Sequence, residues 1–249
     1  FHRFLPPGSG QSGALAVHRW PCKHEGKMSR LIVFDVDSTL LKVESLDFAV
    51  EHALSSAPDG AERTARLKAL TDQGMAGQLD FRSSLEQRLA IAGLTRPAVE
   101  AARERLRTQL TEGMVELLNA LRTRGNDVAA VSGGFVDLVE PALSDLGFAN
   151  GEIRANRFVY EGDEVIGYDR QNPLSRSGGK APVVASLKTL FGKPLAIMVG
   201  DGMTDYEAFD KGAADSFIGF GGVALRAPVR AKAPAYAESV AALHALLLG

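Results

Sequence analysis

The sequence has little of two features that would narrow its class at once: it contains a single cysteine, Cys22, and no long run of apolar side chains. One cysteine excludes an internal disulfide framework and a cysteine-based metal site, and it suits a reducing compartment. The apolar stretch from Ala241 to Leu248 is interrupted by His244 and is far shorter than the roughly 20 residues that cross a bilayer. We therefore expect no membrane partner and a cytoplasmic location.

An excess of charge of one sign is missing as well. The chain has 28 Lys and Arg against 30 Asp and Glu, which gives a formal net charge of -2 at pH 7. Polyanions are bound by clustered basic side chains, so this balance makes nucleic acid an unexpected partner. A small charged metabolite is compatible with it, and we expect the protein to act as a monomer or homodimer. The five histidines lie outside all the motifs below, so neither zinc nor histidine chemistry is predicted.

Residues 1–27 lack the ordered patterns of the rest of the chain. They are rich in Pro and Gly, poor in acidic residues and without a sustained hydrophobic period, whereas a regular pattern begins soon after Met28. We interpret Met28 as the native start and residues 1–27 as a leader that is disordered or non-native. The alternative is the remnant of an organelle transit peptide, because the stretch contains Arg3 and Arg19; the protein would then be in an organelle.

Short, wholly apolar runs recur along the remaining chain, and each one is followed by polar residues and then by a helical pattern. These runs are residues 31–34, 128–131 and 195–199. Such runs are typical of strands buried on both faces of a parallel sheet, and the helices that follow complete βα units. We predict an α/β fold with a doubly wound, mostly parallel sheet. Because ligands bind beyond the carboxyl ends of such strands, Asp35, Ser132 and Asp201 should converge there.

The region from residue 42 to residue 113 has no strand signals. Apolar residues recur there at helical spacing in three places, Leu46 to Leu54, Phe81 to Leu89 and Val99 to Leu106. The region begins only a few residues after Asp35, so it should rise over the strand ends, close on a substrate and exclude water. We assign residues 42–113 to a helical cap and residues 28–41 with 114–249 to a catalytic core. Within the core, residues 158–160 and 165–168 predict a hairpin.

Two carboxylates, Asp35 and Asp37, stand two residues apart directly after the first apolar run. In extended geometry both side chains point to the same side, where they repel unless a cation lies between them or one holds a proton. Both solutions suit phosphoryl transfer: Asp35 would attack phosphorus, and Asp37 would protonate the leaving oxygen and later deprotonate water. An Asp-x-Asp is more often a solvated turn or a helix cap, but its place after a buried strand disfavours that alternative.

A second pair of acids, Asp201 and Asp205, follows the third apolar run, and glycines flank Asp201. Carboxylate and carbonyl oxygens are the ligands of Mg²⁺. We predict a magnesium site formed by Asp35, the backbone carbonyl of Asp37 and Asp201, with Asp205 orienting this shell. A twelve-residue calcium loop is disfavoured because the acids do not have its spacing.

Two further groups suit a phosphate. Ser132, Gly133 and Gly134 stand before a predicted helix and offer a hydroxyl and backbone N–H groups at its positive end. Lys180 follows Ser-Gly-Gly and opens another helix, where its ammonium would offset charge on the transferring phosphoryl group. A tight turn and a surface lysine are the ordinary alternatives for each group taken alone.

Taken together, these motifs resemble those of a known superfamily. Asp35-Val36-Asp37-Ser38-Thr39, Ser132-Gly133-Gly134-Phe135, Ser177-Gly178-Gly179-Lys180 and Gly200-Asp201-Gly202-Met203-Thr204-Asp205 resemble, in this order, the motifs of the haloacid dehalogenase (HAD) superfamily. From about residue 31 to the C-terminus the chain more closely resembles the phosphoserine phosphatase family. The resemblance implies a HAD-like Rossmannoid core with an inserted helical cap. It also implies a magnesium-dependent hydrolase that acts through an aspartyl-phosphate intermediate.

The resemblance also implies individual roles. Asp35 is similar to the family's nucleophile, Asp37 to its acid/base, Ser132 and Lys180 to its phosphate binders, and Asp201 to its remaining metal acid. Glu44 matches the carboxylate that receives the substrate ammonium, and Arg88 the clamp for the substrate carboxylate, whose geometry suits an arginine fork. The other implied site residues are Met75 and Phe81 lining the pocket, Thr204 contacting the substrate, Gly133 donating its N–H and Asn156 supporting the phosphate loop. Core packing is the alternative for Met75 and Phe81, a snorkelling side chain for Arg88 and a helix-start charge for Glu44.

We therefore expect a phosphoserine phosphatase that releases L-serine and phosphate from O-phospho-L-serine, the last step of serine biosynthesis. The alternative enzyme is a related phosphatase acting on another small phosphomonoester. A catalytically silent module phosphorylated on its aspartate as a signal is a third hypothesis, which is disfavoured because Asp37 and a full cap are present.

Overall fold

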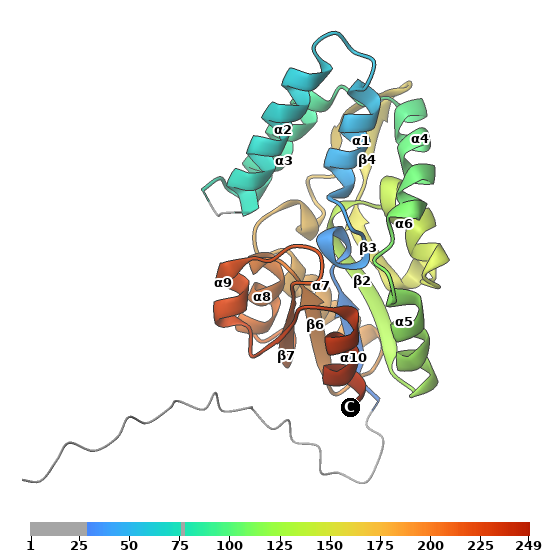
Figure 1. Cartoon of the computed structure of the whole chain (residues 1–249), viewed down its shortest axis with the longest axis vertical. Helices are drawn as coiled ribbons and strands as arrows, with labels where there is room; N and C mark the ends of the chain where they lie inside the picture. Colours follow the sequence, from blue (N-terminus) through green and yellow to red (C-terminus); the bar gives the residue numbers. More distant parts are fainter. Residues whose placement is uncertain (1–28, 76–77) are drawn as a thin grey trace, which may run out of the picture.

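The computed structural model describes residues 29–75 and 78–249, without the side chain of Met75; the expected leader and Met28 lie outside the described residues. A six-stranded sheet in the order β3-β2-β1-β6-β7-β8 occupies the centre of the described part, and all its neighbouring strands are parallel (Figure 1). The strands are β1 (Leu31–Phe34), β2 (Asp127–Phe135), β3 (Ile153–Asn156), β6 (Ala196–Gly200), β7 (Ser216–Phe220) and β8 (Ala235–Ala237). The predicted α/β fold is confirmed.

Helices cover both faces of this sheet. Side chains of Ile32 and Phe34 belong to one hydrophobic cluster, whereas Leu31 and Val33 belong to another, because alternate residues of a strand point to opposite faces. The first cluster includes α5 (Met114–Thr123), α6 (Val136–Asp145) and α10 (Val240–Leu248). The second includes α7 (Lys180–Leu190), α8 (Met203–Asp210) and α9 (Ala227–Lys232). The fold is therefore doubly wound, as predicted.

The strand order reverses beside β1. The chain runs from β1 outward through β2 to β3 and then returns to β6 on the other side of β1. Phe34 is paired with Ala130 of β2 and with Val199 of β6, and the backbone N–H of Asp35 donates to the carbonyl of Val199 at 2.8 Å. Such a reversal is where doubly wound folds bind ligands. Asp35 and Asp201, which the sequence analysis selected, directly follow β1 and β6, and Ser132 lies near the end of β2.

The segment after β1 is not the extended strand that the sequence analysis expected through Asp37. The strand ends at Phe34, and the tight turn η1 (Val36–Leu40) follows, with Asp37 at φ -65° and ψ 137° and Ser38 at φ 52°. A positive φ is uncommon for a residue with a Cβ. The turn persists because Val36 and Leu40 are fully buried, so packing holds both of its ends.

Strand β2 is longer than predicted. The apolar run suggested an end at residue 131, but Phe135 pairs with Asn156 of β3 after an irregular register between Val131 and Phe135. Phe135 is fully buried and stacks on Phe158 at a centroid distance of 3.8 Å. Burial of this aromatic ring keeps the chain in the sheet past Gly133 and Gly134, which a single sequence presents as a loop.

Four helices occupy most of residues 42–113, which agrees with the helical patterns of the sequence. They are α1 (Ser45–Leu54), α2 (Gly60–Met75), α3 (Phe81–Ala92) and α4 (Arg96–Leu106), with the short helix η2 (Arg107–Gln109) after them. We refer to α1–α4 as the cap helices. The chain enters and leaves them side by side, since Lys42 N–H donates to Gln109 and Thr111 N–H donates to Leu40. The division into core and cap at residues 42 and 113 stays a prediction.

The predicted hairpin is confirmed as β4 (Phe158–Glu161) and β5 (Glu164–Tyr168), which pair antiparallel. It also contacts the cap helices. The N–H of Arg96 donates to Asp163 at 2.7 Å, and the N–H of Val165 donates to Leu94 at 3.0 Å. These bonds join the α3–α4 connection to the core. Short helices η3 (Asn150–Glu152) and η4 (Pro173–Ser175) complete the described secondary structure.

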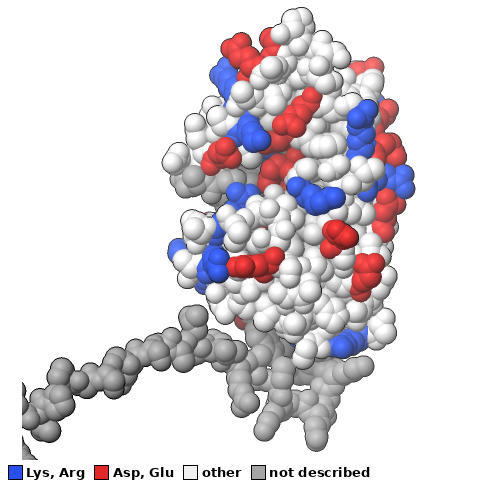
Figure 2. Space-filling view, in the orientation of Figure 1, with Lys and Arg blue, Asp and Glu red and all other residues white. Residues whose placement is uncertain are grey.

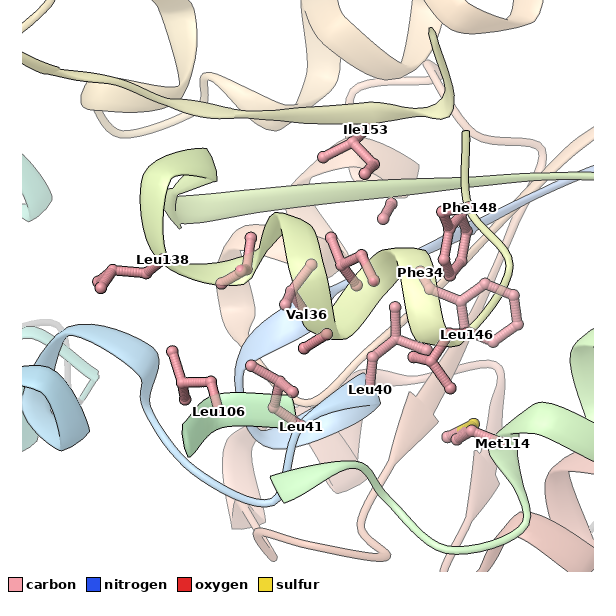
Figure 3. Packing of buried hydrophobic residues seen from close by; sticks show 14 of the residues in the cluster. Phe34, Val36, Leu40, Leu41, Leu106, Met114, Leu138, Leu146, Phe148 and Ile153 are labelled. Carbon is pink, nitrogen blue, oxygen red and sulfur yellow. The ribbon is translucent and has the colours of Figure 1, made fainter. Parts of the chain in front are cut away.

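A shared apolar cluster joins η1 to the helices beside it. Figure 3 shows Val36 and Leu40 of the turn in the same cluster as Phe34, Leu138 of α6 and Met114 of α5. Burial of each such side chain contributes roughly 1.5–3 kcal/mol. This packing fixes the turn that carries Asp37. Within the described residues no helix is both long and apolar enough to cross a membrane.

Candidate active site

A cavity of about 330 Å³ lies between the strand ends of the core and the helices α2 and α3. Its core side is formed by residues that follow β1 and β6, by the last residues of β2 and by the start of α7, and its cap side by α1, α2 and α3. The predicted site residues that line it are Asp35, Asp37, Glu44, Phe81, Arg88, Gly133, Lys180, Asp201 and Thr204. Residues from seven separate places in the sequence thus meet around one space.

Lys180 links two acids on the core side. Its Nζ donates to Oδ1 of Asp35 and to Oδ1 of Asp205, each at 2.5 Å, and the lysine side chain is 8% exposed. Burial alone would lower the pKa of Lys180, but the carboxylates of Asp205 and Asp35 outweigh it and raise this pKa above its ordinary value. Lys180 is therefore a fixed positive charge that touches Asp35.

Asp205 lies behind the cavity lining and is fully buried. Its Oδ2 accepts a hydrogen bond from Gly202 N–H at 3.0 Å, so it holds the turn after β6 as well as Lys180. Gly200 is required here, because a Cβ at that position would lie 2.3 Å from Oδ2 of Asp205. Burial, with the nearby charge of Asp35, raises the pKa of Asp205 to about 7, while Lys180 opposes this rise.

Asp201 is paired with Arg226, a residue that the sequence analysis missed. Nε of Arg226 donates to Oδ2 of Asp201 at 2.5 Å, and its Nη2 donates to Oε1 of Glu44 at 3.4 Å. Burial and then the charge of Asp35 raise the pKa of Asp201 well above its ordinary value, against the effect of Arg226. Arg226 follows an apolar strand, β7, and a Gly-Gly pair, the same signal that marked Asp201, and that rule could have found it.

Asp37 has only neutral hydrogen-bond donors in the part of the chain that the structure describes. Its Oδ1 accepts the backbone N–H of Ser45 at 2.8 Å, and its Oδ2 accepts the hydroxyl of Ser132 at 3.3 Å. Burial, followed by the charge of Asp35, raises the pKa of Asp37 to about 6. A carboxyl group with this pKa exchanges a proton readily near neutral pH.

Glu44 precedes α1 and faces the cavity beside Asp37. Its Oε1 accepts the hydroxyl of Ser38 at 2.8 Å, which the left-handed conformation of Ser38 makes possible from within the turn. Burial and the charge of Asp37 raise the pKa of Glu44 to about 7. A buried carboxylate of this kind gains from a cationic partner, such as an ammonium group, in the cavity.

Arg88 reaches the cavity from α3 and pairs with Asp47 of α1, Nη2 to Oδ1, at 2.5 Å. Phe81, at the start of α3, lies against the core at Gly133, where an added Cβ would be 2.7 Å from its Cζ. Asp80 fixes this helix start by accepting the N–H groups of Arg82 and Ser83. Helix α3 therefore brings a guanidinium and an aromatic ring over the core residues.

Two further predicted residues, Ser132 and Asn156, are not part of the lining. Ser132 is fully buried and accepts the N–H of Gly134 at 2.8 Å while it donates to Asp37. Asn156 is also fully buried, and its Nδ2 donates to the carbonyls of Gly133 at 2.8 Å and Leu174 at 3.1 Å. It thus joins the end of β2 to the segment before Lys180. Met75 ends α2, and its side chain is outside the described structure.

The acids on the core side suit a divalent metal. Asp35, Asp201 and Asp205 can each offer a carboxylate oxygen, and these oxygens lie within 4.8 Å of one another. All three are buried, and the raised pKa values of Asp201 and Asp205 show that negative charge is crowded there. Oxygen donors in this setting fit a hard cation. The structure thus adds Asp205 to the possible ligands, where the sequence analysis preferred the carbonyl of Asp37.

Comparison with known proteins gives one consistent result. The haloacid dehalogenase-like hydrolase family model matches residues 32–210. Phosphoserine phosphatase from Mus musculus is 36% identical over 206 residues, which cover 82% of this chain and 87% of the mouse protein. A phosphoserine phosphohydrolase-like protein from Francisella tularensis superposes with a TM-score of 0.80 at 30% identity, covering 88% of this chain and 100% of that one.

A further solved structure, described as a phospho-aspartyl intermediate analogue of phosphoserine phosphatase, has a TM-score of 0.70 and 28% identity and covers 85% of this chain and 94% of that chain. The identity to the mouse enzyme runs through nearly its whole length, and the fold and ordered motifs agree with it. The chain therefore belongs to the haloacid dehalogenase-like hydrolases and, within them, to the phosphoserine phosphatase family.

Proposed function

We propose that this protein hydrolyses O-phospho-L-serine to L-serine and phosphate through an aspartyl-phosphate formed on Asp35. One observation carries the proposal: a single cavity joins the Asp35–Lys180 pair on its core side to Glu44 and Arg88 on its cap side. The first pair suits a phosphate, and the second offers an anion and a cation for the ammonium and carboxylate of an amino acid. The relatives named phosphoserine phosphatase support the same substrate.

In the first step an oxygen of Asp35 attacks phosphorus, and the bond from phosphorus to the seryl oxygen breaks. Lys180, already in contact with Asp35, offsets negative charge on the phosphoryl oxygens. Asp37 in its protonated form donates a proton to the departing seryl oxygen, for which its pKa of about 6 is suited. L-Serine leaves and Asp35 is phosphorylated.

In the second step Asp37, now ionised, takes a proton from water. The resulting hydroxide oxygen attacks phosphorus, and the bond from phosphorus to the Asp35 oxygen breaks to release inorganic phosphate. The hydrogen bond from the backbone N–H of Ser45 holds the Asp37 carboxylate in place for both transfers. Gly133 N–H and the Ser132 hydroxyl are the proposed donors to the phosphate, with Asn156 holding that segment.

Magnesium is the proposed cofactor. Asp35, Asp201 and the carbonyl of Asp37 would hold it, with Asp205 either orienting this shell or contributing an oxygen. When bound, such an ion neutralises charge on the phosphate and on the crowded acids. Phe81 of α3 on the cap side and Thr204 of α8 on the core side complete the proposed substrate contacts. The place in serine biosynthesis and the cytoplasmic location, with an organelle as the alternative, stay predictions.

The test is phosphate release from L-phosphoserine beside phosphothreonine, phosphoethanolamine, glucose 6-phosphate and p-nitrophenyl phosphate, with Mg²⁺ and with EDTA. We expect a strong preference for phosphoserine that EDTA abolishes. Metal-dependent activity that favours another compound would be consistent with the Asp35 mechanism but would contradict phosphoserine as the substrate. No activity on any compound would contradict both.

A further inference from the structure

The ion pair between Arg88 and Asp47 is placed differently from the other ion pairs of the cap helices. Arg88 lines the cavity, whereas Asp47 lies behind it and is not part of the lining. Their side chains are only 11% and 14% exposed, while those of the Arg63–Asp59 pair are 32% and 60% exposed. A charge pair with so little solvent around it holds its geometry more firmly than a surface pair does.

The hydrogen bonds of Arg88 are incomplete. A guanidinium has five N–H donors in a planar fork, and Nη2 is used by Asp47. Nε of Arg88 is buried and has no hydrogen-bond partner among the described residues. A buried donor without a partner is unfavourable, and a carboxylate that enters the cavity would relieve this. Asp47 thus holds part of the guanidinium while leaving other donors for a ligand.

Helix α1 places Glu44 and the partner of Arg88 in one turn. Glu44 is the N-cap residue of α1, and Asp47 is in its first turn three residues later, where the helix dipole favours an acid. Glu44 faces the cavity directly, whereas Asp47 acts on it through Arg88 of α3. The spacing between the ammonium receptor and the carboxylate receptor is therefore set by α1.

We propose that Asp47 is a positioning residue that aims the Arg88 guanidinium at the substrate carboxylate and so gives the protein its preference for phosphomonoesters that carry one. This inference rests on the proposed function. Asp47 touches neither the substrate nor the reacting atoms, and its whole effect passes through Arg88. Loss of its charge would leave Arg88 in the cavity without a fixed orientation.

The test is Asp47→Asn, assayed on L-phosphoserine and on phosphoethanolamine, which keeps the ammonium but lacks the carboxylate. We expect kcat/KM for phosphoserine to fall about 10- to 100-fold, as for the loss of a hydrogen bond to a charged group, and mainly through KM. We expect kcat/KM for phosphoethanolamine to change less than about threefold, since that substrate does not use Arg88. Glu51→Gln, which removes an exposed charge from the same helix, is the matched control and should leave both unchanged.

A double-mutant cycle separates positioning from a structural role. In an Arg88→Ala background Asp47→Asn should cause no further loss on phosphoserine, because its route of action is gone. Equal losses on both substrates, a full additional loss in the Arg88→Ala background, or tighter binding of phosphoserine by Asp47→Asn would each overturn the proposal. If Asp47→Asn does not fold, Asp47→Glu gives the same comparison, since it displaces the carboxylate by one methylene.

The outcomes also separate this inference from the proposed function. If the unmodified protein shows no preference for phosphoserine over phosphoethanolamine, the proposed function fails, and the role of Asp47 fails with it. If the preference exists and Asp47→Asn keeps it in full, the role of Asp47 alone is refuted.

Discussion

At the scale of single residues, the cavity holds more acids than cations. Asp35 and Asp205 share Lys180, and Asp201 and Glu44 share Arg226. Among the described residues Asp37 has only neutral donors. Burial, followed by the charge of neighbouring acids, raises the pKa of Asp37 to about 6 and that of Glu44 to about 7. A site in this condition gains from a cation and from substrate groups that donate hydrogen bonds.

Substitutions of Asp35 and Asp37 should affect different steps of the reaction. Asp35→Asn should abolish phosphoenzyme formation and turnover, because an amide oxygen is a poor nucleophile. Asp37→Asn should slow turnover by about 10²- to 10⁴-fold. With p-nitrophenyl phosphate, whose leaving group needs no proton, it should accumulate phosphoenzyme. Intact-protein mass spectrometry after acid quench measures the amount of phosphoenzyme. Phosphoenzyme formed by the Asp35→Asn protein would refute the assignment of Asp35 as the nucleophile.

The contact of Phe81 with Gly133 gives a second prediction. A Cβ added at Gly133 would lie 2.7 Å from Cζ of Phe81, so Gly133→Ala must displace the ring or the start of α3. Overpacking of this kind costs about 1–3 kcal/mol. We expect the free energy of unfolding to fall by an amount of this order, and KM to rise for every phosphomonoester because Phe81 and the start of α3 line the cavity. Adding Phe81→Leu, which removes the clash, should lower KM part of the way to its original value. If KM does not fall, the rise comes from weaker phosphate binding by Gly133 instead.

At the scale of elements, the apolar runs and helical periods predict those strands and helices whose formation depends on local sequence. Strands β1 and β6, the hairpin and the starts of α6 and α7 follow from them directly. The extension of β2 to Phe135 and the turn after Asp35 could not be predicted, because both depend on packing against distant residues. Strands β3 and β8 are short, of four and three residues, and give too weak a signal.

The same division applies to the site. Asp35 and Asp37 follow β1, Asp201 follows β6 and Ser132 lies near the end of β2, so the fold class places them together. Glu44, Arg88 and Thr204 required the family resemblance, since each is an ordinary helix residue by pattern. Asp47 contacts the site only through Arg88, which is 41 residues away in the sequence, so no local pattern marks it.

A pH-dependent contact joins the cap helices to α6. Arg107 holds Asp145 in a fork, Nε to Oδ2 at 2.7 Å and Nη2 to Oδ1 at 2.9 Å, and this bonding lowers the pKa of Asp145 below its ordinary 3.8. A carboxyl group whose pKa is lower in the folded chain stabilises it above the unfolded pKa and ceases to do so as pH falls through the folded value.

We therefore expect Asp145→Asn to lower Tm at pH 7 and to have little effect on Tm near pH 3. Calorimetry at several pH values measures the difference from the unmodified protein. The effect should be small, because both side chains are partly exposed to solvent. Asp72→Asn, which changes an exposed acid of α2, is the control and should show no such pH dependence. A Tm difference that stays constant down to pH 3 would show that the contact is not electrostatic.

At the scale of the whole molecule, charge is spread over the surface and concentrated in the cavity. On the face shown in Figure 2, Lys and Arg side chains lie among Asp and Glu side chains, and neither sign forms a large continuous patch. The buried acids Asp35, Asp201 and Asp205 are instead within a few ångströms of one another. Repulsion among these acids destabilises the folded chain but not the unfolded chain. A cation that binds between them should therefore raise the stability of the fold.

This linkage predicts that Mg²⁺ raises the stability of the whole fold. A ligand that binds only the folded chain contributes about 2.7 kcal/mol at a hundred times its Kd, and for a chain of about 250 residues each kcal/mol shifts Tm by about 2–4 °C. We expect Tm to rise by roughly 5–10 °C at saturating Mg²⁺ and to return on addition of EDTA. A sodium salt at equal ionic strength should not reproduce the rise.

The variant that tests the origin of this shift is Asp201→Asn, which removes one acid of the cluster without changing its size. Its Tm should respond to Mg²⁺ by only a small fraction of the unmodified shift, whereas Asp72→Asn should respond in full. Because the comparison uses the Tm of each protein with and without metal, any change that Asp201→Asn makes to the metal-free fold cancels. An undiminished shift in Asp201→Asn would mean that Mg²⁺ acts elsewhere on the molecule, and the assignment of the metal to the ends of β1 and β6 would be wrong.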